Sequence, residues 1–250
     1  MEAMFITAAL AFGLSFLFAL GGVGAAVALV PVLHWLGVPF AAARPTGLMV
    51  NTVSMTGASY SNIKNRRLDF RVGLPIIVAS AALAPVGAWC TTIIPGSAVM
   101  VVFAGFLLVS GAMLLFYQGG KYAERYREDC PIAGPAAIGA AAGFLSGLLG
   151  VGGGGVISPL LIFMGFHPKK VAAITAFAVP FSSFVGFVAY SMMGTVQWRV
   201  LVAASLAAYV GGFLGTGFMQ NRLPPGTVRK LLGVVLFGLA ARMIVGLVGR

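Results

Sequence analysis

Long uninterrupted apolar stretches are the feature that most constrains how this chain can fold. Eight such blocks follow one another, at residues 4–36, 45–63, 72–94, 98–117, 134–164, 171–193, 198–220 and 228–248. Most of them have close to the roughly 20 residues that an α-helix needs to cross a bilayer. Only 8% of the residues are charged, whereas about a quarter are charged in a soluble domain. The sequence therefore predicts an all-α polytopic membrane protein, and we expect it in the bacterial inner membrane.

Charge and cysteine content exclude several other classes. The formal net charge is +11, but the basic residues lie in short connections between the blocks. That distribution is typical of loops beside anionic lipid and argues against nucleic acid as a partner. Cys90 and Cys130 lack the spacing of a metal site or a disulfide framework, so we expect free thiols, no metal and no cofactor. The first block follows Glu2 rather than a basic segment and is too long for a removable signal sequence.

The two halves of the chain match when one is shifted by 128 residues. The motif at 22–24 then meets the motif at 150–152, and Pro31 meets Pro159. The order of long block, glycine run, proline, loop and next block also repeats. This predicts two homologous repeats of four segments each, at 1–118 and 134–250, joined by a linker at 119–133.

A glycine run interrupts the long block of each repeat. Five of the six residues from Gly150 to Gly155 are glycine. The G-x-G-x-x-G spacing lacks the preceding strand of a dinucleotide-binding site, and the G-x-x-x-x-G spacing lacks the lysine of a P-loop. A helix-packing seam would need small residues on one face only, and each glycine weakens a helix by about 1 kcal/mol relative to alanine. We therefore expect each repeat to open with a glycine-broken helix or a helical hairpin.

The distribution of the 16 Lys and Arg residues tests how the blocks cross the membrane. If every block crosses once, ten of them lie on the side of the 64–71 connection and six lie opposite. If each long block enters and returns, the counts become twelve and four. Because cytoplasmic connections are enriched in basic residues, we expect the second half to be inverted. Discontinuous helices at matching places of two halves also indicate a transport site.

Acidic residues are few and lie outside the apolar blocks. They are Glu2, Asp69, Glu124, Glu128 and Asp129. A cation carrier or a carboxylate proton relay would bury at least one acid in the membrane. An enzyme would need paired acids, an activated nucleophile or a metal cluster. We therefore expect that the protein is not an enzyme. Neutral hydrogen-bond donors and the positive ends of half-helices favour an anion instead.

The predicted site for a small anionic substrate lies near the middle of the bilayer. Backbone N–H groups of the two glycine runs would solvate the anion, and side chains that follow each run would add donors. Ser158 and Pro159 are expected in the first turn of a half-helix. For any single Ser or Thr the alternative is a bond within its own helix, and Arg44 could instead extend to the interface. The predicted substrate-binding residues are Gly22, Gly24, Arg44, Thr46, Asn51, Thr52, Ser54, Gly152, Gly153, Gly154, Ser158, Thr175, Ser182 and Ser183.

Paired motifs in the two halves resemble a known family. They are "FLFALGGVGAAVALVPVL" (16–33) with "GVPFAAARPTG", and "FLSGLLGVGGGGVISPLL" (144–161) with "GFHPKKVAAITA". Together with the loops "NRRLDFR" and "GTVQWR", they resemble the sulfite exporter TauE/SafE family. The resemblance implies a secondary transporter of sulfite, sulfonates or related anions, built from two four-segment repeats. The first glycine run is the less complete one, which leaves open whether both halves bind substrate equally.

The hypothesis is therefore a secondary membrane transporter that exports a small sulfur-containing oxyanion, such as sulfite or an organosulfonate, by alternating access. A passive anion channel is the first alternative. A membrane accessory or assembly protein without transport activity is the second. The lipid bilayer is the expected environment, and the oligomeric state is left open, with a homodimer as one arrangement.

Overall fold

The computed structural model describes residues 2–19, 22–64, 70–116, 132–193, 196, 198–222 and 224–248. All regular structure within these residues is α-helical, in ten helices. The first five are α1 (Glu2–Ala19), α2 (Ala26–Trp35), α3 (Phe40–Lys64), α4 (Phe70–Cys90) and α5 (Gly96–Phe116). The other five are α6 (Ala133–Leu149), α7 (Gly154–Phe163), α8 (Pro168–Met192), α9 (Trp198–Arg222) and α10 (Pro225–Val248).

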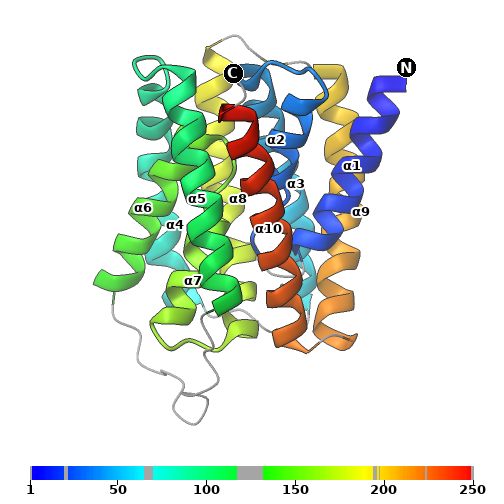
Figure 1. Cartoon of the computed structure of the whole chain (residues 1–250). Coiled ribbons are helices and arrows are strands. Elements are labelled where there is room, and N and C mark those ends of the chain that lie inside the picture. The colour runs from blue at the N-terminus through cyan, green and yellow to red at the C-terminus, as the bar shows by residue number, and fades with distance from the viewer. Residues whose placement is uncertain are drawn as a thin grey trace.

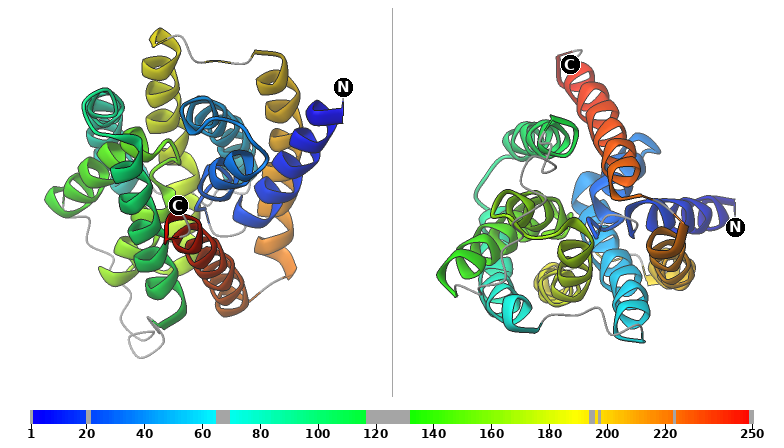
Figure 2. Two further views of the ribbon diagram at one scale, coloured as in Figure 1. Left: turned by 45° about the horizontal axis from the view of Figure 1, so that its top comes forward. Right: turned by 90° about the horizontal axis from the view of Figure 1, so that it is seen from below.

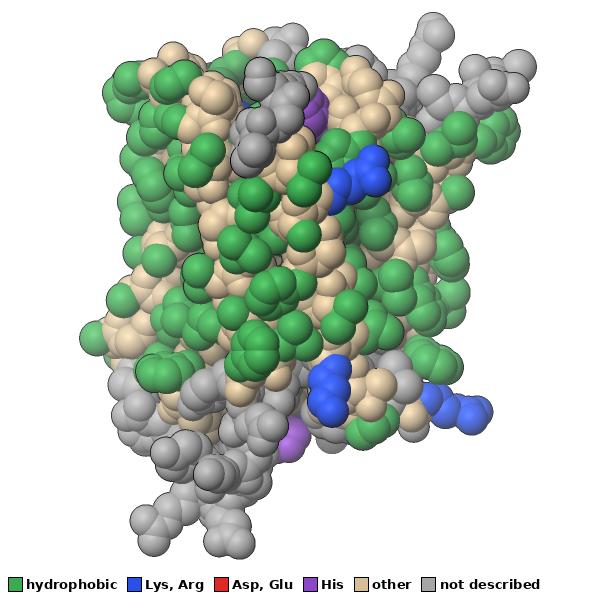
Figure 3. Space-filling view, in the orientation of Figure 1, with side chains coloured by type: hydrophobic (Ala, Val, Ile, Leu, Met, Phe, Trp, Pro, Cys, Tyr) green, Lys and Arg blue, Asp and Glu red, His purple; other side chains and the backbone are tan. Residues whose placement is uncertain are grey.

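Four segments of the described chain are long and apolar enough to cross a bilayer. They are Phe70–Cys90, Gly96–Phe116, Lys169–Met192 and Leu201–Phe218. The surface between the two ends of the molecule is dominated by hydrophobic side chains, with the described Lys and Arg toward the ends (Figure 3). Leu74 and Leu206, for example, are 62% and 67% exposed, as suits side chains that face lipid. The prediction of an all-α polytopic membrane protein is confirmed.

Each long apolar block is two short helices with a break between them, so the predicted helix breaks are confirmed. The chain leaves the helix between Ala19 and Ala26, and again between Leu149 and Gly154. Figure 1 shows α1 running inward from the end that carries the N-terminus and α2 returning toward that end. There α6 enters from the opposite end, to which α7 returns. The second helix of each pair has only 10 residues, which is too few to cross a bilayer alone.

Each hairpin contacts the other half of the chain through its first helix. The first helix of each hairpin packs along the fourth helix of the other half, α1 along α9 and α6 along α4 (Figure 2). Glycines permit these close approaches. A β-carbon on Gly147 would collide with the carbonyl oxygen of Ala84, and one on Gly215 with that of Phe16. Small residues at such positions allow membrane helices to approach closely.

The central helices are α3 and α8. Besides contacting each other, α3 contacts α2 and α9, and α8 contacts α4 and α7. The apolar window of α8 is 72% buried, against 39% for α4. Buried polar side chains on these two helices, such as Asn51 and Ser183, therefore face protein rather than lipid.

Elements of the second half recur 128 residues after their counterparts in the first. The helices α2 and α7 have 10 residues each and α3 and α8 have 25 each, with starts separated by that spacing. The glycines with positive φ follow the same rule, Gly22 with Gly150, Gly24 with Gly152 and Gly37 with Gly165. Residues 117–131, which include most of the expected linker, lie outside the described part. The division into two repeats and their sidedness in the bilayer stay predictions.

Candidate functional site

The two breaks meet inside the molecule. The space that a side chain of Gly154 would need is taken by the carbonyl oxygens of Gly22 and Val23. Gly22, with a φ of +68°, lies against the backbone of Ala172 on α8. Positive φ values cost other residues roughly 1–2 kcal/mol, so the glycines allow both the turns and this close contact. Non-helical backbone from both halves therefore lies together in the protein interior, as unpaired backbone groups at membrane depth require.

Asn51, at 0% exposed, joins the two breaks. Its Oδ1 accepts a long hydrogen bond of 3.5 Å from the N–H of Ala26, the first residue of α2. Its Nδ2 donates to Oγ of Ser183 on α8 over 2.9 Å. A β-carbon on either Gly24 or Gly152 would collide with this amide. One side chain thus contacts both glycine turns and both central helices.

Arg44 is a buried cation beside the second break, with 6% of its surface exposed. Its guanidinium lies 4.5 Å from the centre of the Phe40 ring. Its Nη1 is 3.5 Å from the Tyr190 hydroxyl, which donates to the carbonyl oxygen of Gly147 over 2.8 Å. Its Nε has no hydrogen-bond partner. No carboxylate pairs with it in the part of the chain that the structure describes, although an unpaired buried charge costs several kcal/mol.

Seven of the predicted residues come together around these breaks. They are Gly22, Gly24, Arg44, Asn51, Gly152, Gly154 and Ser183. Their role in binding stays a prediction, but their contacts place glycine backbone, amide and hydroxyl donors and one cation within one cluster.

The other predicted residues make local contacts. The hydroxyls of Thr46, Thr52 and Ser182 donate to carbonyls of their own helices, which is the alternative stated for any single Ser or Thr. Ser158 donates to Thr175 over 3.3 Å, between α7 and α8.

The remaining predicted positions lie to one side of the cluster or differ from the expectation. Ser54 is buried beside Gly212 of α9, and Gly153 lies against Ala142 of α6. The placement of Ser158 and Pro159 in the first helical turn is wrong, because α7 already begins at Gly154. Glycines at its start still adopt helical geometry, which moves the serine and the proline into the second turn.

Two aromatic residues outside the predicted set contact Arg44, namely Phe40 and Tyr190. Tyr60 on α3 and Tyr190 on α8 each follow a glycine run, among other polar residues. Tyr190 is buried, whereas Tyr60 is 53% exposed. No sequence signal distinguishes the two tyrosines, since only helix rotation decides which one is buried. For Phe40 the sequence offers no signal at all.

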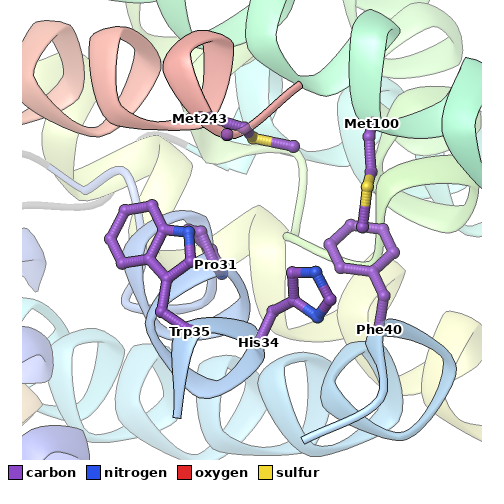
Figure 4. A pocket seen from close by; sticks show the side chains of 7 residues that line it. Pro31, His34, Trp35, Phe40, Met100 and Met243 are labelled. Atoms are coloured by element: carbon purple, nitrogen blue, oxygen red, sulfur yellow. The ribbon is translucent and has the colours of Figure 1, made fainter. Parts of the chain in front are cut away.

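A cavity of about 170 Å³ is lined in part by Phe40, whose ring also contacts the Arg44 guanidinium. Figure 4 shows His34 and Trp35 of α2 and Phe40 of α3 below Met100 and Met243 of α5 and α10. Pro31 and Gly246 complete the lining. The His34 ring is held by a 3.3 Å contact between Nδ1 and the carbonyl oxygen of Val38. Phe40 therefore contacts both the cavity and the buried cation.

Comparison with known proteins agrees with this architecture. The family model described as sulfite exporter TauE/SafE matches residues 7–243. A probable membrane transporter protein, YunE of Bacillus subtilis, is 25% identical over 89% of this chain and 90% of its own length. The probable membrane transporter protein ORF9 of a Sinorhizobium species is 25% identical over 88% of this chain and 85% of its own.

A plant relative matches a shorter region more closely. Sulfite exporter TauE/SafE family protein 6 of Arabidopsis thaliana is 37% identical over 33% of this chain and 19% of its own length. No solved structure gives a significant match. Because the family model spans nearly the whole sequence and the helices form a multi-pass bundle, the chain belongs to the sulfite exporter TauE/SafE family of membrane transporters.

Proposed function

We propose that this protein is a secondary transporter that exports a small sulfur-containing oxyanion, such as sulfite or an organosulfonate, by alternating access. The observation that carries the proposal is Arg44, a 6% exposed cation whose Nε lacks a partner. A charge buried in this way is costly until an opposite charge is brought to it. An anionic substrate supplies that charge, and the guanidinium can bind an oxyanion through parallel N–H donors.

The surroundings of Arg44 support an anion rather than a cation. Asn51 Nδ2, the Ser183 hydroxyl and the glycine backbone offer donors that can replace part of the hydration shell of an oxyanion. The half-helices α2 and α7 both begin at the breaks, and each adds the partial positive charge of a helix N-terminus. The names of the family and of its plant members, sulfite exporters, support a sulfur oxyanion as the substrate.

Alternating access is supported by where the short helices end. Both hairpins reach the interior without crossing it, and their tips contact each other at Gly154 and Gly22. A movement of one hairpin and its partners against the other would therefore open the site to one side at a time.

The decisive experiment measures sulfite flux in proteoliposomes that contain the purified protein. We expect flux that saturates with sulfite concentration, and a loss of at least about tenfold in flux at low sulfite for Arg44→Gln, because removal of one partner from a buried charge pair costs roughly 3–5 kcal/mol. Arg242→Gln is the matched control, since Arg242 is exposed and stacks on the Trp35 ring at 4.7 Å. It should transport like the unaltered protein.

Other outcomes identify the alternatives. Flux that rises linearly with the gradient and never saturates would indicate a passive anion channel. Vesicles that move no anion, although the protein is folded and correctly inserted, would indicate an accessory protein. Equal flux in Arg44→Gln and the unaltered chain would contradict the role of Arg44.

A further inference from the structure

The two breaks differ in the side chains that surround them, although their backbones are alike. The position 128 residues after Asn51 is Val179, and the position 128 residues after Arg44 is Ala172. The position equivalent to Ser183 in the first half is Met55. Each polar group of the cluster is therefore present once, while the glycine turns are present twice.

The Asn51 amide has opposite effects on the two half-helices. Its oxygen faces the first half-helix, where it accepts from the N–H of Ala26. A carbonyl oxygen in this place accepts from one of the unpaired N–H groups of α2 and offsets part of the positive charge at its N-terminal end. Its nitrogen faces the second break, beside Gly152, and donates to Ser183. Asn51 thus supplies an acceptor to the first break and donors to the second.

Among the described residues, the second break has no side-chain acceptor at the position equivalent to Asn51, although the carbonyl oxygens of Gly22 and Val23 lie close to Gly154. Gly153 precedes α7 and has no side chain, and Val179 cannot accept a hydrogen bond. The Ser183 hydroxyl accepts from Asn51 and keeps its own hydrogen to donate. The Cβ and Cγ of Arg44 lie against this same break, close enough that a β-carbon on Gly150 would overlap them. The buried Nε of Arg44 has no hydrogen-bond partner. Donors and positive charge are thus in excess here.

We infer that the anion binds at only one of the two breaks, the one between α6 and α7, and that Asn51 occupies the equivalent place at the start of α2. The inference rests on the proposed function and makes it more specific. The site is formed by Arg44, the Asn51 Nδ2–H that does not donate to Ser183, the Ser183 hydroxyl and the N-terminal end of α7. One chain therefore binds one anion, although its backbone contains two similar breaks.

The test is equilibrium binding of radiolabelled sulfite to the purified protein in lipid nanodiscs. The unaltered chain should bind one sulfite. Ser183→Ala should bind about tenfold more weakly, because a hydrogen bond to a charged group is lost. Ser80→Ala is the matched control, since Ser80 is also 0% exposed but donates within its own helix, to Ile77, over 3.2 Å. It should bind like the unaltered chain.

A second variant places the Asn51 amide at the equivalent position of the other half. Val179→Asn introduces an acceptor near the start of α7 and should weaken sulfite binding tenfold or more, because the amide competes with the anion. Val179→Leu has nearly the side-chain size of asparagine but no acceptor, and it should bind within about threefold of the unaltered chain. Thermal unfolding of each variant separates loss of binding from loss of fold.

The outcomes separate this inference from the broader proposal. Two sulfite ions per chain, or unchanged affinity in both Ser183→Ala and Val179→Asn, would overturn the single-site assignment and leave anion transport standing. Failure of the unaltered chain to bind or transport sulfite and organosulfonates would overturn the proposed function and this assignment with it.

Discussion

Gly150 lies so close to Arg44 that a β-carbon on the glycine would overlap both Cβ and Cγ of the arginine. The glycine ends α6 with a φ of +74°, and its N–H donates to the carbonyl oxygen of Ser146 over 2.9 Å. The turn that breaks the helix is therefore also the surface against which the buried cation packs.

Gly150→Ala should destabilise the protein. Positive φ alone costs a non-glycine residue about 1–2 kcal/mol, and the overlap with Arg44 adds to this, so we expect a loss of at least about 2 kcal/mol. Thermal unfolding in detergent measures it. Gly105→Ala in α5 is the control, since nothing lies within 4 Å of the added carbon and alanine favours a helix by up to about 1 kcal/mol. Equal stability of the two variants would contradict the strain at Gly150.

The Tyr190 hydroxyl links Arg44 to the end of α6. In Tyr190→Phe the Gly147 carbonyl and the guanidinium both lose a partner, and an unsatisfied buried group costs about 1–3 kcal/mol. We expect lower thermal stability together with altered sulfite affinity, measured by unfolding and by concentration-dependent flux. Tyr60→Phe should change neither, because Tyr60 is 53% exposed. An unchanged Tyr190→Phe protein would show that the hydroxyl does not hold Arg44.

His167 makes stability depend on pH at the start of α8. The pKa of its ring lies below the ordinary value because burial disfavours the imidazolium and Lys169 repels it. The neutral ring accepts from the Lys169 N–H at 3.1 Å and caps the helix. The ring therefore binds a proton more readily in the unfolded chain than in the folded protein. The stability that the neutral His167 contributes is present at and above its ordinary pKa and is lost as the pH falls below it.

A matched pair of variants tests the His167 cap. His167→Asn should keep a cap without titrating, so its stability should fall less between pH 7 and pH 5 than that of the unaltered chain. His167→Ala should lose about 1 kcal/mol already at pH 7. Thermal unfolding across this range is the measurement, and the same acid sensitivity in His167→Asn would assign the effect to another group.

Inverted halves predict that two distant connections face the same side of the membrane. Lys64 and Arg222 are both exposed, at the ends of α3 and α9. Single cysteines at these positions, in a background without Cys90 and Cys130, should react with a membrane-impermeant reagent from the cytoplasmic side only. Reaction from opposite sides would mean that the halves are parallel in the bilayer.

Transport should not require a carboxylate of this chain. Four of the five acidic residues, Asp69, Glu124, Glu128 and Asp129, lie outside the described residues, and all five lie outside the apolar blocks. Sulfite can carry its own proton, and a potential contributes about 2.3 kcal/mol per charge per 100 mV. Replacing the four acids by amides should leave the pH dependence of flux unchanged at clamped potential. If transport of a permanently charged sulfonate is strictly proton-dependent and one of these replacements abolishes that dependence, transport does require a carboxylate of this chain.

The sequence by itself determined the features that depend on neighbouring residues. Apolar blocks of bilayer length must form helices, because lipid offers no partners for unpaired backbone groups. The breaks near Gly22 and Gly150 were equally local, since the runs of three glycines at 21–24 and five at 150–155 weaken a helix in the middle of a hydrophobic block. Family membership followed from the same motifs.

Only the tertiary structure decided which donors meet. Thr52 and Asn51 are neighbours with similar chemistry, yet the threonine hydroxyl bonds to Leu48 of its own helix, while the Asn51 amide reaches Ser183, 132 residues away. Arg44 likewise meets Tyr190 across 146 residues. Periodicity predicts that a segment is helical, but its rotation against a neighbour is set by close contacts of glycine with facing backbone. Those contacts exist only in the folded bundle.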